Sequence, residues 1–170
     1  MNSKYKAFLF KHYVLIVPAL LLATIAYINN ANVKDSLPLY ATLSGVALSA
    51  IYFVQKQKLE EIKLFKELFT EFNSRYEGLN DKLADIKDGK LKETREINKI
   101  LDDYFNLCSE EHLFYREGRI HNAAWSSWCR GMQEHLLNDI IKAYWEKAQE
   151  ENSYYGLTTT VINDGAKIKT

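Results

Sequence analysis

Two cysteines and two histidines in the second half of the chain could bind a metal ion or act in nucleophilic catalysis. They are Cys108, His112, Cys129 and His135. Cys108 and His112 share one face of a helix, but at 100° per residue Cys129 and His135 point about 240° apart. Zinc needs four ligands in a tetrahedron, so this spacing disfavours a zinc site, and no local motif supports a cysteine–histidine nucleophile. We expect no metal, no cofactor and no catalytic residues.

Other catalytic patterns are also missing from the sequence. It contains no zincin helix, phosphate loop, dinucleotide fingerprint or serine elbow. The adjacent acids Asp102–Asp103 and Glu110–Glu111 diverge around a helix, so they are expected to be solvated faces and not paired catalytic carboxylates. The sequence therefore predicts a protein that is not an enzyme.

Three arginines with aromatic and polar neighbours could instead bind an anion. Arginine binds phosphate through a bidentate fork, a helix N-terminus offers free backbone N–H groups, and an aromatic ring can stack on a base. The candidate ligand-binding residues are Arg116, Arg119, His121, Asn122, Trp125 and Arg130. The alternative is that the arginines pair with nearby glutamates, namely Glu110, Glu111, Glu117 and Glu134.

The tryptophans of this stretch have a second interpretation, as anchors of a hydrophobic core. Apolar and aromatic residues recur here at helical spacing: Trp125, Trp128, Cys129, Met132, Leu136, Ile140, Ala143 and Tyr144. Such a stripe is typical of the buried face of a helix. A small domain also needs large anchors, because it buries a smaller share of its surface. We therefore expect the tryptophans in the core of a three-helix domain.

The elements that carry these residues are predicted to be helices separated by turns. The sequence "KDGK" at 87–90 predicts a break, since Asp-Gly favours turns. One helix is predicted from 91 to 116, and another from 123 to 149 with Asn122 as its N-cap. In the tail, β-branched residues at 158–162 precede a turn at 163–165. The tail is expected to form a short hairpin or strand, or to remain loose.

The segment before these helices, residues 58–88, is predicted to form an amphipathic helix. Its apolar residues alternate by three and four: Ile62, Phe65, Phe69, Phe72, Tyr76, Leu79, Leu83 and Ile86. That spacing is typical of a coiled-coil seam. Two interpretations are open, a helix that packs on its own domain and a stalk that self-associates beneath a membrane.

Two uncharged runs near the N-terminus predict a transmembrane hairpin. They are Tyr13–Ile28 and Leu37–Gln55, separated by the polar sequence "NNANVKDS". A helix needs about 20 apolar residues to cross hydrocarbon, and a cleavable signal peptide would explain only the first run. Lysines flank the outer ends, at 4, 6 and 11 and at 56, 58, 63 and 66, whereas the loop holds only Lys34. The positive-inside rule then places both termini in the cytoplasm.

The charge balance disfavours one class of partner. The chain has 22 lysines and arginines and 22 aspartates and glutamates, so its formal net charge is zero. Proteins that coat long nucleic acids carry a basic field, which this sequence does not have. We therefore expect no DNA or long RNA as a partner. In the cytoplasm, Cys108 and Cys129 are expected to be reduced thiols.

The stretches "YFNLCSEEHLFYREGRI" (Tyr104–Ile120) and "WSSWCRGM" (Trp125–Met132) join an acidic aromatic helix, a glycine turn and a tryptophan-rich helix. With two N-terminal spans and a small cytosolic domain, the chain resembles the membrane effectors of type III CRISPR antiviral systems. The resemblance covers the whole architecture. It implies that the cytosolic domain binds a cyclic oligoadenylate such as cyclic tetra-adenylate, and that the membrane part then disrupts the bilayer or opens a pore. It also implies a homo-oligomer, for example a tetramer, in a bacterial inner membrane.

The sequence thus predicts an all-α membrane protein in three parts. These are a two-span transmembrane hairpin (1–57), an amphipathic coiled-coil-like connecting helix (58–88), and a helical cytosolic sensor domain with a C-terminal tail (89–170). The predicted function is that of a membrane-anchored antiviral effector triggered by a cyclic oligonucleotide. The alternative is a non-enzymatic membrane scaffold or partner subunit whose cytosolic helices bind another protein.

Overall fold

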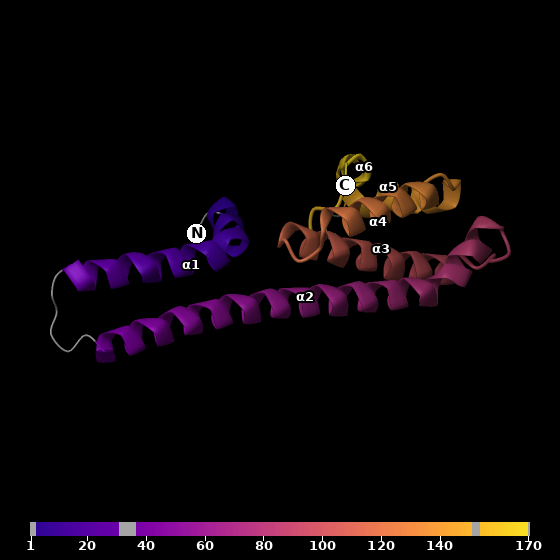
Figure 1. Cartoon of the computed structure of the whole chain (residues 1–170). Coiled ribbons are helices and arrows are strands. Elements are labelled where there is room, and N and C mark those ends of the chain that lie inside the picture. Colours follow the sequence, from indigo (N-terminus) through magenta and orange to yellow (C-terminus); the bar gives the residue numbers. More distant parts are fainter. Residues whose placement is uncertain (1–2, 31–36, 151–153, 170) are drawn as a thin grey trace. The chain divides into compact units, whose positions relative to one another are not determined.

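The computed structural model describes residues 3–30, 37–150 and 154–169, with side chains from residue 12 onward apart from that of residue 14. These residues form helices and no strand, which confirms the predicted all-α class (Figure 1). The helices are α1 (Ser3–Asn30), α2 (Leu37–Lys87), α3 (Thr94–Arg116), α4 (Asn122–His135), α5 (Asp139–Glu150) and α6 (Thr159–Ala166). The chain divides into two compact units, Met1–Ile62 and Lys63–Thr170, and α2 supplies residues to both.

The first unit contains α1 and the beginning of α2. The Tyr40 hydroxyl donates a hydrogen bond to Asn29 Oδ1 at 2.5 Å. The ammonium group of Lys58 lies 4.7 Å from the centre of the Tyr13 ring. The first contact joins the end of α1 to the beginning of α2, and the second joins an earlier part of α1 to a later part of α2. The two helices therefore run antiparallel within this unit.

Apolar side chains are exposed on both helices of the first unit. Among the described residues, α2 is the one helix long and apolar enough to cross a membrane. Only 6% of its most apolar stretch of 18 residues is buried. The apolar part of α1, Leu15–Asn30, is shorter. The large exposed apolar residues between 15 and 53 are Leu15, Leu20, Leu22, Tyr27, Leu37, Leu39, Val46, Leu48, Tyr52 and Phe53. The second predicted span thus has the length and composition of a membrane helix, whereas the two-span hairpin stays a prediction.

The second unit is a helical domain with a core of large aromatic and aliphatic side chains. Trp125 of α4 and Trp145 of α5 are each 1% exposed, and Phe105 of α3 is fully buried. The rings of Phe105 and Trp145 stack with their centres 4.5 Å apart. Trp128 is partly buried and packs against this core. The prediction that Trp125 anchors the core is therefore confirmed. The predicted stripe is wrong in α5, where Ile140 and Ala143 are exposed and Ile141 and Trp145 are buried instead.

The apolar stripe of α2 packs largely on its own domain. Phe72, Leu83 and Ile86 are buried, and Phe65, Tyr76 and Leu79 pack against the same core. Two members of the stripe are exposed. Ile62, the last residue of the first unit, is 63% exposed, and Phe69 is 40% exposed. Most of the predicted seam is thus intramolecular core. Self-association through its exposed members stays a prediction.

Turns occur where glycines were predicted to place them, but the last long helix is divided. Gly89 and Gly118 have positive φ angles of 67° and 71°, as expected where a helix reverses into a turn. The predicted helix over 123–149 is wrong as one element, because α4 ends at His135 and α5 begins at Asp139. Asn138 causes the restart, since its Oδ1 accepts the N–H groups of Ile140 and Ile141. Asn122 does not cap α4; the residue before that helix is His121, which makes no side-chain cap.

The C-terminal tail folds as a helix and not as a strand, hairpin or loose segment. The Thr158 side chain caps α6 by accepting the N–H of Val161 at 3.2 Å. Ile162 is then fully buried, and Gly165 faces Trp125 and Cys129 of α4. The β-branched residues were misleading because tertiary packing of one helical face outweighs their weak strand preference.

Candidate functional site

The candidate arginines lie at two places in the second unit. Arg116 is the last residue of α3, and its Nη1 donates to the carbonyl oxygen of Tyr155 at 3.0 Å. Arg119 is exposed in the turn that follows. Arg130 is eight residues beyond Asn122 on α4, which corresponds to about 12 Å along a helix axis. The cluster seen in the sequence thus separates into a pair at the turn and a single arginine on α4.

The other candidate residues contact neighbours within the domain. The His121 ring packs against Phe65 with ring centres 4.2 Å apart. Asn122 Oδ1 accepts a hydrogen bond from the Tyr115 hydroxyl at 3.3 Å. Trp125 stacks on Tyr115 at 5.0 Å, and on its α3 neighbour His112 at 5.4 Å. Because Trp125 is 1% exposed, it has no free face on which a base could stack. Its role in this structure is that of a core anchor.

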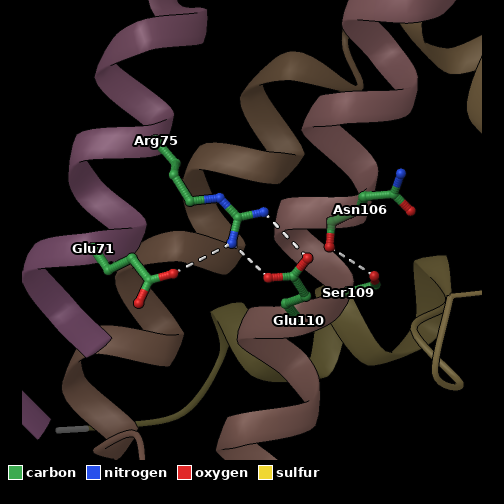
Figure 2. A network of polar contacts seen from close by, with 5 residues as sticks. All are labelled: Glu71, Arg75, Asn106, Ser109 and Glu110. Carbon is green, nitrogen blue, oxygen red and sulfur yellow. Dashed lines mark hydrogen bonds and ion pairs between the residues drawn. The ribbon is translucent and has the colours of Figure 1, made fainter. Parts of the chain in front are cut away.

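The alternative pairing of these arginines with glutamates does not occur within the described residues. Arg130 Nη1 donates instead to Ser126 Oγ at 2.7 Å. Glu110 is bound by Arg75 of α2 through two hydrogen bonds of 2.5 and 3.1 Å, with Glu71 3.9 Å from the same guanidinium (Figure 2). The hydrogen bond to Glu110 raises the pKa of Arg75 above its ordinary value. Glu110, one of the four glutamates considered, is thus bound by α2 and not by a candidate arginine.

Arg130 lines a groove between α4, α5 and α6. The groove encloses about 600 Å³, within the range of about 300 to 1,000 Å³ that is usual for small-molecule sites. Its charged and polar side chains are Arg130, Gln133, Glu134, Lys142, Glu146, Thr159 and Asn163. Two cations could bind a phosphate there, although two acids share the groove with them. This is the place where an anionic ligand could meet Arg130.

The cysteine–histidine quartet lies in the core, with the thiols protonated. The described residues contain no group of three or more ligating side chains placed to hold a metal ion. Burial raises the pKa of Cys129 to about 12, and it raises that of Cys108 well above its ordinary value. Burial lowers the pKa of His135 to about 4, and its Nε2 lies 3.0 Å from the Tyr76 hydroxyl. Thiols held in this way are poor nucleophiles.

Glu111 is a candidate residue that the sequence did not indicate. It is 5% exposed, so the expectation that both acids of the Glu110–Glu111 pair are solvated is wrong. The two side chains point 100° apart on α3, and therefore Glu110 reaches Arg75 while Glu111 faces the domain interior. Burial raises the pKa of Glu111 to about 8. The sequence signal that could have singled it out is its spacing, because Glu111 follows Tyr104 by seven residues and Cys108 by three on the buried face of α3.

No protein family, characterised protein or solved structure matches the chain. The resemblance to antiviral membrane effectors therefore rests on the sequence features given above.

Proposed function

We propose that the chain is a non-enzymatic, membrane-anchored binding protein of the bacterial inner membrane. The observation that carries this proposal is the composition of α2, whose first part exposes apolar side chains and whose later part supplies core residues to the helical domain. One uninterrupted helix thus serves both as anchor and as core element.

The anchor follows from the cost of exposed apolar surface. Each Å² of such surface removed from water stabilises a protein by about 25 cal/mol. Leu37, Val46, Leu48 and Phe53 are each more than half exposed. A helix satisfies its own backbone hydrogen bonds, so lipid can surround these side chains without leaving polar groups unpaired. Lysines then follow the apolar part, which favours a cytosolic position for the second unit.

Binding is favoured over catalysis by the state of the reactive side chains. Cys108 and Cys129 are buried thiols with raised pKa values. A catalytic cysteine needs a partly exposed, electropositive setting that lowers its pKa. The large groove beside Arg130 instead offers a surface on which a ligand or another protein could bind.

Alkaline extraction of bacterial membranes that contain the full chain tests the anchor. The wild-type chain should stay with the lipid. A Val46→Lys, Leu48→Lys variant should be released, because each lysine near the middle of a span costs about 2.5 to 3.5 kcal/mol. The same changes at Leu59 and Ile62, two exposed apolar residues further along α2, form the matched control and should not release the chain. A wild-type chain found in the soluble fraction without detergent would refute the anchor.

A second candidate function is the sensing of a cyclic oligonucleotide. It is favoured by the presence of two cationic side chains, Arg130 and Lys142, in the lining of one groove. Here the cytosolic domain would bind the phosphates, and the membrane part would disrupt the bilayer or open a pore, as in the effectors that the sequence resembles. Such a chain would act as a homo-oligomer. In the scaffold alternative, the membrane anchor is the same and the groove binds a protein partner.

Titration of the full chain in detergent with cyclic tetra-adenylate distinguishes these candidates. Arg130→Ala and Lys142→Ala should each weaken binding by about 1.5 to 3 kcal/mol, as for a lost hydrogen bond to a charged group. Arg119→Ala is the matched control, because Arg119 lies at the turn and not in the groove. Binding should also weaken as salt is added. If no cyclic oligonucleotide binds, or if Arg130→Ala binds equally well, the scaffold function is preferred.

A further inference from the structure

A second cavity lies inside the helical domain, between α2, α3 and α4. It encloses about 190 Å³ and is separate in its lining from the groove beside Arg130. Its walls include three aromatic side chains, one amide and one carboxyl: Tyr76, Tyr104, Trp128, Asn73 and Glu111. A cavity of about 150 Å³ accommodates a molecule of the size of benzene. The space therefore suits a compact organic molecule.

Glu111 lines this cavity without a partner of its own. The described residues form no hydrogen bond or ion pair with its carboxyl group, although the side chain is 5% exposed. The nearest arginine, Arg75, is already bound by the neighbouring Glu110 through both of its terminal nitrogens (Figure 2). A buried carboxylate without a partner is costly, so the carboxyl keeps its proton in the empty site, and a cationic ligand would stabilise its ionised form.

The aromatic walls favour the same charge. The faces of tyrosine and tryptophan rings carry negative potential and attract ammonium groups. Tyr76 and Trp128 are partly buried, whereas Tyr104 is 2% exposed. The hydroxyl of Tyr76 is engaged by His135, so its ring is held in place. On α4, Ser127 and Gly131 line the cavity and are exposed, which puts the opening on that side.

We propose that this cavity is a binding site for a compact organic monocation, such as a quaternary or primary ammonium compound, with Glu111 as its counter-ion and Tyr76 and Trp128 as its aromatic walls. The site needs neither the membrane anchor nor an anion in the groove beside Arg130. It is therefore independent of both candidate functions given above.

Binding of a cation at this site is coupled to a proton. Burial raises the pKa of Glu111 to about 8, so the carboxyl of the empty site is mostly protonated at pH 7. A bound cation stabilises the carboxylate, and therefore Glu111 loses its proton to solvent when the ligand enters. Affinity should rise between about pH 6 and pH 8 and then become constant.

The groups around Glu111 do not share this titration. The pKa values of the neighbouring phenols and thiols are raised, which leaves these groups neutral at pH 6 to 8: Tyr76, Tyr104, Cys108 and Cys129. The pKa of Arg75 is raised, so this residue stays charged. Its guanidinium is bound to Glu110, and its charge partly opposes the rise that burial causes in the pKa of Glu111. Burial lowers the pKa of His112 and of His135, so neither carries a charge near pH 8.

The test is calorimetric titration of the full chain in detergent with choline and with its neutral isostere 3,3-dimethyl-1-butanol. Choline should bind saturably, and the isostere should bind about tenfold more weakly or worse, because it has the shape but not the charge. Repeating the titration at pH 7 in buffers of different ionisation enthalpy should give release of about one proton per choline bound.

Glu111→Gln keeps the shape of the protonated side chain and should weaken choline binding by about tenfold or more, with no proton released. Glu117→Gln, which changes an exposed acid at the end of α3, should bind choline as the wild type does. Circular dichroism of both variants should match the wild type. Absence of saturable choline binding, equal binding of the isostere, or unchanged choline binding by Glu111→Gln would each overturn the proposal.

Discussion

Glu111 and His135 are two buried side chains of the helical domain whose pKa values move in opposite directions. Burial raises the pKa of Glu111 to about 8 and lowers that of His135 to about 4. Both groups are therefore neutral near pH 6, where burial costs them least. Each makes the stability of the fold depend on pH, but in different ranges.

The stability of the wild-type chain is expected to fall as the pH rises from 6.5 to 8. In this range Glu111 of the unfolded chain is already ionised, whereas the folded protein still holds the proton, so a higher pH favours unfolding. The loss should be about 2 kcal/mol, since one pKa unit corresponds to about 1.4 kcal/mol. His135 offsets only a small part of this loss, because its unfolded form is about half protonated at its ordinary pKa of 6.5 and loses that proton above it, whereas the folded form is neutral throughout.

Thermal unfolding of the full chain in detergent at pH 6.5 and pH 8.5 measures this effect. Glu111→Gln should remove most of the difference and should be more stable than the wild type at pH 8.5. Glu117→Gln, at an exposed position, should keep the wild-type difference. An unchanged pH dependence in Glu111→Gln would show that its carboxyl is not buried as described.

For single residues of α4, the sequence predicted burial correctly where apolar side chains recur at helical spacing. Trp125 lies on an apolar stripe with helical spacing, and it is a core anchor with 1% of its surface exposed. Glu111 lies seven residues after Tyr104 and three after Cys108, in register with the buried face of α3, so helical spacing allowed for its burial although its charge argued for exposure. Glu111 is buried because α2 and α4 cover α3 at this position, and it has no ion pair among the described residues because Arg75 binds Glu110. These are tertiary contacts, which a local pattern does not contain.

Among the helices, α6 packs against α4 at one close contact. Gly165 packs on α4, where a Cβ atom would lie 2.7 Å from Trp125 Nε1 and closer still to Cys129 Sγ. Both of those side chains are buried and have little room to move. The strand expected at 158–162 has no place in this arrangement, because one face of α6 is needed to cover α4.

Gly165→Ala is expected to destabilise the domain by about 1 to 3 kcal/mol, the usual cost of extra volume in a packed core. The matched control is Gly78→Ala, because Gly78 lies in α2 with open space around its Cα. That change should stabilise the domain by about 0.5 to 1 kcal/mol, as alanine favours a helix interior over glycine. Thermal unfolding of the two variants should therefore shift in opposite directions. A neutral Gly165→Ala would mean that α6 does not pack closely on α4.

The boundaries of elements were predicted well where glycine ends a helix and poorly where a polar side chain starts one. Turns at Gly89 and Gly118 were predicted and occur. The restart at Asn138 was missed because the apolar stripe continues through it, so periodicity alone extended the helix. The cap was assigned to Asn122, yet Asn138 is the asparagine that accepts backbone N–H groups. Both residues have the right chemistry, and only the fold distinguishes them.

On the scale of the whole molecule, α2 links an exposed apolar stretch to the core of a helical domain. Its early residues, such as Val46 and Leu48, are exposed, whereas Phe72 and Leu83 are buried. Composition was enough to separate these two parts, because an uncharged run and a mixed apolar–charged stripe differ plainly in the sequence. A ligand for the domain could not be derived from the candidate residues, since the candidate arginines lie at two places and Glu111 was not among the candidates.

The proposed anchor and orientation are tested most directly by labelling single introduced cysteines in intact cells with a membrane-impermeant maleimide. Cys108 and Cys129 are buried and do not compete for the reagent. Leu37→Cys, at the exposed beginning of α2, should be labelled from outside. Lys92→Cys, in the exposed turn before α3, should be labelled only after the membrane is opened. Labelling of Lys92→Cys from outside together with protection of Leu37→Cys would contradict a helical domain held at the cytosolic face of the membrane.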